Sequence, residues 1–307
     1  MAFRTTGPCP GPANLLAEDK RVILITGGTG FVGRHVVARL VEAGEAVRVL
    51  ARSRPGLAGA EIAQGDVTDP AVVAAAARGC DAVIHLVGII RERGDATFQS
   101  VHVEGTRAVL RACQEAGVPR LLHMSALGSR PHARSRYHQT KWEAEELVRA
   151  SGLAATIFRP SVIVGPVGGF LPEVRGLLHR GPVIPIIGSG KSLLQPVWIE
   201  DVVSCFVAAL ARPATAGHAY EIAGPETFTF EQIVALVAEA EGVRKRRLHL
   251  PVAMVRPAVW MMSRILPNFP LTSEQLTMLL EDNVCDTSAM REDLGVEPDS
   301  IRGHLRE

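Results

Sequence analysis

Tyr137 and Lys141 are the residues of this chain whose types and spacing best suit catalysis. They stand four positions apart in a segment that begins as a strand and continues as a helix, so both side chains are expected on one helix face. An ammonium close to a phenol favours the phenolate and lowers its pKa from about 10. Such a tyrosine can exchange a proton with a carbonyl or an alcohol while a nicotinamide carries the hydride. The alternative is an ordinary amphipathic helix that exposes both side chains, because this spacing is common by chance.

Three glycines with a regular spacing suggest where that nicotinamide would come from. They lie in ITGGTGFVGRH, residues 25–35, directly after one predicted strand and directly before a predicted helix. In dinucleotide-binding turns, one such glycine makes the tight turn, one admits the pyrophosphate and one lets the helix pack on the strand. The first N–H groups of the helix then face the phosphates, although a glycine-rich turn without a ligand is the alternative. The cofactor-binding residues predicted here are Gly27, Thr29, Gly30, Phe31, Val32 and Gly33.

The end of the second predicted strand indicates which dinucleotide is bound. An NAD enzyme usually carries Asp or Glu about 20 residues after the glycines, where it holds the ribose hydroxyls. This chain has Arg52, Ser53 and Arg54 there and no acid. A guanidinium pairs with a 2′-phosphate that a carboxylate would repel. NADP(H) is therefore predicted in preference to NAD(H), with solvated surface arginines as the alternative. The ends of the third and fourth strands add Asp66, Val67, Leu86, Val87 and Gly88 to the predicted nucleotide site.

Alternating strands and helices position these residues. Strands are expected at 22–26, 46–51, 61–67, 81–88, 119–125 and 154–160, and helices at 31–43, 70–79, 97–116 and 138–151. This alternation is typical of a parallel sheet covered on both faces. Beyond it, a strand end with a helix is expected at 197–211, a strand at 219–224 and a helix at 230–242.

The predicted fold class is therefore α/β, a Rossmann-type doubly wound parallel sheet with a small C-terminal lobe. Residues 1–20 are expected as a disordered lead-in and 21–165 as the NADP(H)-binding Rossmann core. Residues 166–307, where the rhythm loosens and Gly and Pro become dense, are expected as a mixed segment that completes the core and forms the lobe.

Composition excludes several classes of protein. The 307 residues are 47% apolar, which is enough for a sizeable core, and the net charge of +1 gives no field that would attract nucleic acid. The five cysteines are scattered, which predicts free thiols in a reducing compartment and no metal site. The chain shows neither a signal peptide nor about 20 uninterrupted apolar residues. These features predict a cytoplasmic protein without a transmembrane segment, with a position peripheral to the inner membrane as an alternative.

The glycine turn and the Tyr-Lys pair together resemble the extended branch of the short-chain dehydrogenase/reductase superfamily, of the NAD-dependent epimerase/dehydratase type. The resemblance covers nearly the whole chain and includes TGGTGFVG (26–33), VHVEGTRAVLRAC (101–113), FRPSVIVGP (158–166) and LLQPVWIEDVV (193–203). It implies that Pro160 and Ser161 lie near the nicotinamide. The tail, LTSEQLTMLLEDNVCD (271–286) followed by LGVEP (294–298), looks like the group related to the nucleotide-binding accessory subunit of respiratory complex I. That group implies a retained NADP(H) site and chemistry that is often degenerate.

The chain departs from the catalytic pattern of that superfamily in two places. The catalytic Ser or Thr of the family aligns with Ala126, and a slip of one position would choose Ser125 instead. The predicted catalytic residues are therefore Tyr137, Lys141 and Ser125. The Asn that the family often places early in the helix after the fourth strand is His102 here. A missing hydroxyl removes one hydrogen bond to a developing oxyanion, worth about 2–4 kcal/mol, and would slow chemistry without harming cofactor binding.

Other polar residues near these motifs have simpler interpretations. His102, His123 and His138 are expected to be packed or surface histidines rather than catalysts. Asp201 is expected to cap a helix rather than to pair with Glu200 as a catalytic carboxylate.

Two further segments can be interpreted either as ordinary parts of the fold or as binding surfaces. The basic run RKRR (244–247) is expected on a solvated face, with acidic lipid or a partner protein as the alternative. The Met- and Trp-rich segment VAMVRPAVWMMSRIL (252–266) is expected to pack in the lobe, with a quinone- or membrane-facing surface as the alternative.

The sequence is compatible with three hypotheses for the function of the protein. The first is an NADP(H)-binding protein similar to the complex I accessory subunit, with a respiratory or quinone-linked role, which Ala126 and the tail favour. The second is an active NADPH-dependent oxidoreductase that uses Tyr137 and Lys141 on an unknown carbonyl or quinone. A nucleotide-sugar epimerase or dehydratase is a third. The expected partners are a nicotinamide dinucleotide and a respiratory or membrane-associated protein, and not nucleic acid.

Overall fold

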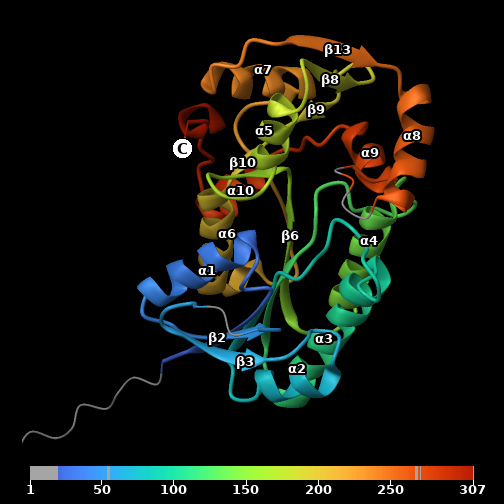
Figure 1. The fold of residues 1–307 in the computed structure, drawn as a ribbon. Coiled ribbons are helices and arrows are strands. Elements are labelled where there is room, and N and C mark those ends of the chain that lie inside the picture. The colour runs from blue at the N-terminus through green and yellow to red at the C-terminus, as the bar shows by residue number, and fades with distance from the viewer. Residues whose placement is uncertain (1–19, 54–55, 267–268, 270, 307) are drawn as a thin grey trace, which may run out of the picture.

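The computed structural model describes residues 20–53, 56–266, 269 and 271–306. Nearly all of the predicted lead-in, together with Cys9 and Arg54, lies outside the described residues. The described chain is an α/β protein in which helices cover both faces of a large sheet (Figure 1). The predicted fold class is confirmed.

The central sheet has seven strands in the order β3-β2-β1-β4-β5-β6-β11, and every neighbouring pair is parallel. The strands are β1 (Val22–Thr26), β2 (Ala46–Ala51), β3 (Ala60–Gln64), β4 (Ala82–His85), β5 (Arg120–Met124), β6 (Ala154–Pro160) and β11 (Ala219–Ile222). The strand order reverses between β1 and β4, so the chain leaves these two neighbours in opposite directions. Ligands of open α/β sheets bind at such a switch point, outside the carboxyl ends of the strands.

The alternation of side chains along β1 explains the layers on the two sides of the sheet. Ile23 and Ile25 pack in one apolar cluster with α1 and α6, whereas Leu24 packs in another with α2, α3 and α4. Successive side chains of a strand point to opposite faces, so an apolar run without interruption is buried on both sides. The helices are α1 (Phe31–Glu42), α2 (Pro70–Ala77), α3 (Gly105–Ala116), α4 (Arg136–Arg149) and α6 (Ile199–Ala211).

The predicted helix at 97–116 is in fact two elements. Gln99–Glu104 form a π-helical turn, η1, which runs directly into α3. Within this turn the side chain of His102 is buried and reaches both Ile89 and Thr140. π-helical turns are rare and occur often at functional sites. This turn therefore indicates that the functional site lies at this end of the sheet.

A smaller lobe stands above the carboxyl ends of the strands (Figure 1). It contains the parallel pair β8–β13 and the antiparallel pair β9–β12, while β7 pairs with β10 below it. The chain returns from β10 to the core through α6 and β11, so the lobe is interleaved with the sheet. The remaining elements are β7 (Ile163–Val164), α5 (Leu171–His179), β8 (Val183–Ile187), β9 (Leu193–Leu194), β10 (Val197–Trp198), η2 (Pro213–Thr215), β12 (Phe228–Thr229), α7 (Phe230–Ala240), β13 (Arg246–Leu250), α8 (Val252–Ile265), α9 (Ser273–Leu279), α10 (Ser288–Leu294) and η3 (Ile301–His304).

The prediction that Asp201 caps a helix is wrong. β10 runs straight into α6, which begins at Ile199 with Trp198 as its N-cap, so Asp201 already lies within the first turn. Its carboxylate accepts a 2.9 Å hydrogen bond from the N–H of Asp299. Glu200 instead forms an ion pair with Arg39 of α1, and its Oε1 lies 2.8 Å from Nδ1 of His35 on the same helix. Both acids therefore link structural elements.

Two further expectations were that the cysteines are free thiols and that the chain has no transmembrane segment. Cys80, Cys113, Cys205 and Cys285 are free thiols, as predicted. Among the described residues, no helix combines the length and the apolar composition that a membrane crossing requires.

Candidate functional site

The predicted cofactor residues gather along one edge of the central sheet. They follow the carboxyl ends of strands that are neighbours in the sheet order, so they share the edge of the sheet that contains the switch point. The residues are 27–33 after β1, Arg52 and Ser53 after β2, Asp66 and Val67 after β3, 86–88 after β4, Ser125 after β5, and Pro160 and Ser161 at the end of β6.

The glycine turn between β1 and α1 is folded too tightly for side chains. Gly27 has a φ of +79°, and its carbonyl accepts a 3.0 Å hydrogen bond from the N–H of Gly30. A Cβ on Gly33 would lie 2.1 Å from the Gly27 carbonyl oxygen, and a Cβ on Gly27 would lie 3.0 Å from the backbone after β4. Within the described chain no side chain caps the first turn of α1. The turn thus has the close backbone approach and the N–H donors that fit a pyrophosphate.

Arg52 and Ser53 are exposed beyond the end of β2, next to Asp66 beyond β3. Partial burial works against ionisation of Asp66, but hydrogen bonds from the N–H and the hydroxyl of Thr68, with the charge of Arg52, hold its pKa below the usual value. Asp66 is therefore engaged with Thr68. Arg52 makes no hydrogen bond or ion pair within the described part of the chain, so its guanidinium is available to a phosphate.

The other side chains of the turn serve the fold. The Phe31 ring packs under the loop after β7, where Cβ atoms on Gly165, Gly168 and Gly169 would approach it to 2.7, 2.6 and 2.7 Å. Phe31 can therefore offer its backbone N–H, rather than its ring, to a nucleotide. Val32 is buried in the core, and Thr29 is exposed.

Lys141 is buried between the carboxyl ends of β4 and β5. Its Nζ donates a 2.9 Å hydrogen bond to the carbonyl oxygen of Met124, and a Cβ on Gly88 would lie 3.0 Å from the same Nζ. Burial lowers the pKa of Lys141 to about 8, although the charge of Glu145 acts in the opposite direction. Burying a cation is costly unless it is paired or hydrogen-bonded. The buried ammonium of Lys141 therefore lies beside residues 86–88, the backbone segment that is predicted to line the nucleotide.

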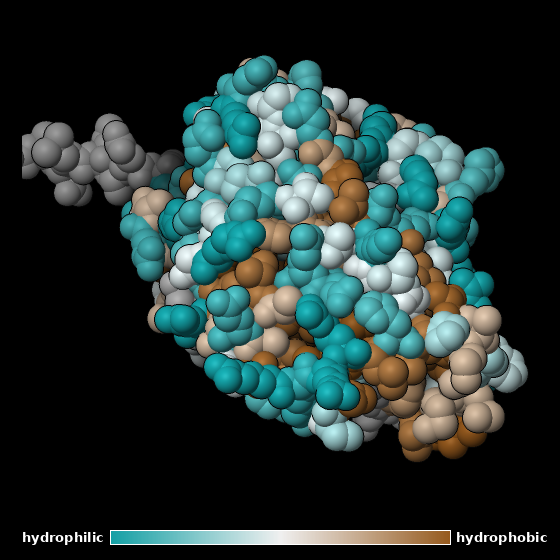
Figure 2. All heavy atoms as spheres, turned by 90° about the horizontal axis from the view of Figure 1, so that it is seen from above, coloured by the Kyte–Doolittle hydropathy of each residue, from teal (hydrophilic) through white to brown (hydrophobic). Residues whose placement is uncertain are grey.

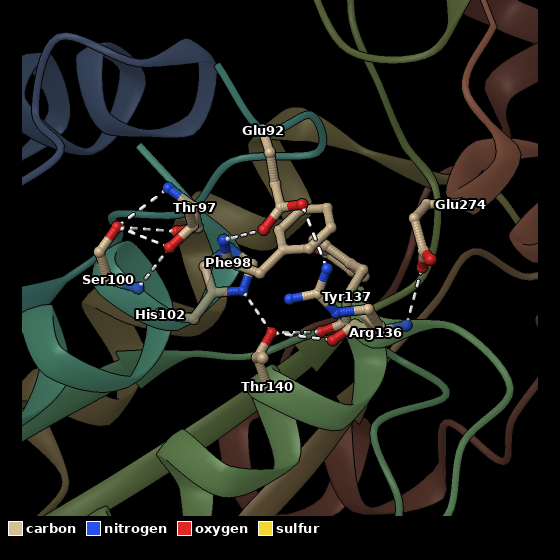
Figure 3. A network of polar contacts seen from close by, with 9 residues as sticks. All are labelled: Glu92, Thr97, Phe98, Ser100, His102, Arg136, Tyr137, Thr140 and Glu274. Carbon is tan, nitrogen blue, oxygen red and sulfur yellow. Dashed lines mark hydrogen bonds and ion pairs between the residues drawn. The ribbon is translucent and has the colours of Figure 1, made fainter. Parts of the chain in front are cut away.

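Tyr137 lies one helical turn before Lys141, at the start of α4 (Figure 3). Its ring meets the rings of His102 and Phe98 edge-on, with centroid distances of 5.4 and 6.0 Å. Burial raises the pKa of Tyr137 to about 12. The predicted lowering by Lys141 is therefore wrong in this arrangement, because the ammonium is directed at Met124 and the aromatic surroundings disfavour a phenolate. Tyr137 is present as a protonated phenol and can act as a proton donor.

His102 bonds Thr140 on the helix that carries Tyr137 (Figure 3), and it also contacts the loop after β4. Its Nδ1 lies 2.9 Å from Oγ1 of Thr140, and its Nε2 lies 3.1 Å from both the N and the O of Ile89. The Thr140 hydroxyl also donates toward the carbonyls of Arg136 and Tyr137, which leaves its lone pair for an N–H on Nδ1. Burial, helped by the charge of Lys141, lowers the pKa of His102 to about 2. His102 is therefore packed, as expected, but as a neutral ring that also holds α4 in place.

The strand end after β5 provides two serine hydroxyls and no hydroxyl at Ala126. Ser125 is buried, and its Oγ donates a 3.2 Å hydrogen bond to Oγ of Ser129. Ala126 is also buried. His138 likewise turns to a local partner, with its Nδ1 2.9 Å from Oγ of Ser135. The hydroxyl that could assist Tyr137 is therefore that of Ser125 or its partner.

Sequence reasoning missed a polar row beneath the site. Thr26, His85 and His123 are neighbours across β1, β4 and β5. His85 bonds Thr26 at 2.6 Å and Thr106 at 3.1 Å, while His123 has no partner on either ring nitrogen among the described residues. Burial lowers the pKa of His85 to about 3 and that of His123 well below its usual value. Histidines inside otherwise apolar strands were the available signal. Both rings are neutral.

The C-terminal segment closes over this edge of the sheet. Glu274 of α9 accepts a 2.7 Å hydrogen bond from the N–H of Arg136, the residue before Tyr137 (Figure 3). Asn283 accepts a 2.7 Å hydrogen bond from Ser161 and donates one of 3.2 Å to the carbonyl of Leu127. Neither Glu274 nor Asn283 belongs to a motif that predicts such a role. Ser161, predicted near the nicotinamide, is thus tied to the closing segment.

Within the described residues, no cluster of three or more His, Cys, Asp or Glu side chains could hold a metal ion.

Comparisons with known proteins agree with this geometry. The family model described as "NAD dependent epimerase/dehydratase family" matches residues 23–223. A "Ceramide reductase" of Caulobacter vibrioides is 32% identical over 242 residues, covering 77% of this chain and 76% of that protein. The mitochondrial "NADH dehydrogenase [ubiquinone] 1 alpha subcomplex subunit 9" of Arabidopsis thaliana is 28% identical over 306 residues, covering 92% of this chain and 76% of that protein. The dTDP-glucose 4,6-dehydratase DesIV of Streptomyces venezuelae, solved with NAD and TYD bound, shares the fold at a TM-score of 0.75 and 21% identity, covering 93% of this chain and 94% of that one.

Proposed function

The chain belongs to the NAD dependent epimerase/dehydratase family, as its motifs predict, and we propose that it is an NADP(H)-dependent oxidoreductase. The observation that carries the proposal is the buried Lys141, whose ammonium lies between Met124 and Gly88 at the switch point of the sheet. A buried cation with a single carbonyl acceptor suits a site where hydroxyl or phosphate oxygens of a dinucleotide arrive. The similarity to a ceramide reductase supports a reductive role.

The dinucleotide would lie across the edge of the sheet. The turn formed by Gly27, Gly30 and Gly33 would hold the pyrophosphate, because it leaves room for close approach and presents the first N–H groups of α1. Arg52 would pair with a 2′-phosphate, which is the reason to prefer NADP(H) over NAD(H). Lys141 would face the nicotinamide half of the molecule. The residues present therefore fit the cofactor.

The nicotinamide, when bound, supplies or accepts the hydride. In the reducing direction Tyr137 gives its phenolic proton to the oxygen of a carbonyl substrate, so that the carbonyl becomes an alcohol. Lys141, whose ammonium is held by the Met124 carbonyl, would bind the nicotinamide half of the dinucleotide rather than the phenol. His102 stays neutral and holds α4 against the loop after β4. Without a hydroxyl at Ala126, the developing oxyanion has one donor fewer, so turnover is slow.

A second function is favoured by Ala126 together with the similarity to the complex I subunit. In this version the protein holds NADP(H) as a structural or sensing group and serves a respiratory or quinone-linked assembly, at a position peripheral to the membrane. The Ser125 hydroxyl is then a packing group bonded to Ser129, and Tyr137 does not transfer a proton.

Fluorescence titration of the purified protein with NADPH and NADH, before and after removal of co-purified nucleotide, tests the shared premise. No binding of either nucleotide would refute both functions. Weak, rapidly exchanging NADPH is expected for an oxidoreductase, and carbonyl and quinone substrates are then screened with wild type and Tyr137→Phe. Loss of turnover in Tyr137→Phe with unchanged NADPH affinity supports the oxidoreductase. Tight NADPH that exchanges slowly, with no function lost in Tyr137→Phe, supports the nucleotide-holding role instead.

A further inference from the structure

Helix α8 has two apolar sides, of which the fold covers one. Val259 is its single buried residue, flanked by the half-buried Val255 and Met262. Further round the helix, on its exposed surface, lie Met254, Ala258, Met261 and Ile265, with Met254 71% and Ile265 64% exposed. Their spacing of four, three and four residues forms one stripe along the helix. A contiguous group of exposed apolar side chains commonly marks a surface that binds another molecule or a membrane, so we expect this stripe to be covered by something beyond the described chain. These four residues, with the exposed Trp260, are called the α8 stripe.

The charges around the α8 stripe indicate what covers it. Residues 242–273 contain six Lys or Arg and no Asp or Glu, in a chain whose net charge is +1. Two of the six have local partners, since Arg247 pairs with Glu231 and Lys245 donates to carbonyls at and just after the end of α5. The other four are exposed and form no ion pair within the described chain: Arg244, Arg246, Arg256 and Arg264.

Arg264 and Trp260 place a basic and an apolar side chain in direct contact on the surface of α8. The guanidinium of Arg264 lies 4.0 Å from the centre of the Trp260 ring, and Trp260 is 52% exposed. On β13, Arg247 and His249 face Glu231 of α7, so Arg246 and Leu248 point to the other side of the strand, where both are exposed. Figure 2 looks down on the lobe and shows apolar side chains grouped at its edge among hydrophilic ones. Arg264 and Trp260 thus join a basic and an apolar side chain on α8, and Arg246 and Leu248 do so on β13, the strand that directly precedes α8.

We propose that this face, the α8 stripe with Arg246 and Arg264, docks on the surface of an anionic lipid bilayer. Apolar side chains would enter the boundary between headgroups and acyl chains, and the arginines would meet the lipid phosphates, as in interfacial amphipathic helices. The unpaired arginines of this face would repel those of a second copy, which disfavours a symmetric dimer through the same face. An acidic protein could pair with the arginines, but its charges would not account for the apolar side chains of the α8 stripe.

The docking face adjoins an opening in the lobe. Ser263 and Leu266, at the end of α8, line a cavity of about 390 Å³ together with Arg91, Glu92 and Thr272. Glu92 also bonds the N–H of Phe98, whose ring meets Tyr137. Docking would thus place this cavity near the lipid headgroups. The inference does not rest on the proposed function, because it needs neither a nucleotide nor turnover.

Vesicle flotation with the full chain tests the proposal. Vesicles of phosphatidylglycerol and phosphatidylcholine in equal parts are compared with vesicles of phosphatidylcholine alone, at low and high salt. Binding is expected on the anionic vesicles, weakened by salt, with a blue shift of Trp260 fluorescence that is absent from Trp260→Phe. Arg246→Gln with Arg264→Gln should weaken binding about fivefold per arginine. The triple change Met254→Gln, Met261→Gln and Ile265→Gln should weaken it at least about tenfold.

A matched control keeps the result specific. Val167→Gln with Arg111→Gln removes one exposed apolar and one exposed basic side chain elsewhere on the surface and should bind vesicles as wild type does. Equal loss in this control, or no binding of wild type to anionic vesicles, overturns the proposal. A dimer in light scattering that the triple variant dissociates would assign the face to a second copy and overturn it as well. NADPH titration of every variant shows separately whether the nucleotide site is intact.

Discussion

The Nζ of Lys141 lies 2.9 Å from the carbonyl oxygen of Met124, so a helix side chain is tied to the end of the strand next to the switch point. This bond decides where the charge of the site is held. It keeps the ammonium beside Gly88, while burial keeps the phenol of Tyr137, one turn away, protonated. Lys141 is thus positioned for a ligand rather than for its neighbour.

Replacing Lys141 should stabilise the protein while impairing its site. Burial lowers the pKa of Lys141 from 10.5 to about 8, so the unfolded chain binds more protons than the folded one between these values. At about 1.4 kcal/mol per pKa unit, the charged lysine costs the fold about 3 kcal/mol below pH 8. Lys141→Met should therefore raise the free energy of unfolding at pH 7. Its advantage over wild type should shrink as pH rises from 8 toward 10.5.

Urea denaturation of both proteins across that pH range measures this difference. An advantage that stays constant with pH would show that the ammonium is not the source. NADPH affinity, measured in parallel, should fall in Lys141→Met even though the protein is more stable.

Arg52 should discriminate between the two nicotinamide dinucleotides. A charge-assisted hydrogen bond to the 2′-phosphate contributes about 1.5–3 kcal/mol, so Arg52→Ala should weaken NADPH binding about 10- to 100-fold. NADH lacks that phosphate and should bind nearly as it does to wild type. Titration with both nucleotides provides the internal control, and Arg78→Ala, which removes an exposed arginine beyond α2, should change neither. Equal losses for NADPH and NADH would refute the role of Arg52.

Gly33 should not tolerate even a methyl group. A Cβ at this position would lie 2.1 Å from the carbonyl oxygen of Gly27 and 2.6 Å from Cα of Gly28. Gly33→Ala should therefore displace the turn, cost about 1–3 kcal/mol of stability and abolish nucleotide binding. Gly176, within α5 and open to added atoms, is the matched control. Gly176→Ala should stabilise the helix by up to about 1 kcal/mol and leave binding unchanged; thermal unfolding and NADPH titration read out both variants.

His102 should contribute to stability through the hydrogen bonds of its neutral ring and not through a positive charge. Its pKa is lowered to about 2 by burial, so no inflection from this residue is expected between pH 5 and 9 in NADPH binding or turnover. His102→Phe leaves the N–H of Ile89 without its acceptor and should cost about 1–3 kcal/mol. His102→Gln, which can replace both contacts, should recover most of that loss. A binding curve that titrates near pH 6.5 in wild type and not in His102→Gln would contradict a neutral ring.

Features that depend on neighbouring residues were predictable from the sequence. The turn of Gly27, Gly30 and Gly33 forms because backbone sterics within seven residues exclude side chains, and the apolar runs of the strands report burial on both faces. The parallel sheet follows from the alternation of such runs with amphipathic helices. The family resemblance was also visible, because it rests on these same local motifs.

What depended on distant contacts was not predictable. Asp201 failed as a helix cap because β10 runs directly into α6, and its true partner is the N–H of Asp299, 98 positions away. The predicted direction of the Tyr137 pKa shift was wrong because burial raises that pKa, while the carbonyl of Met124, at the end of β5, holds the ammonium that was expected to lower it. The row of His85 and His123 exists only in the register of β4 with β5. Spacing along the chain reports local geometry, whereas burial and charge are set by segments that the fold brings together from afar.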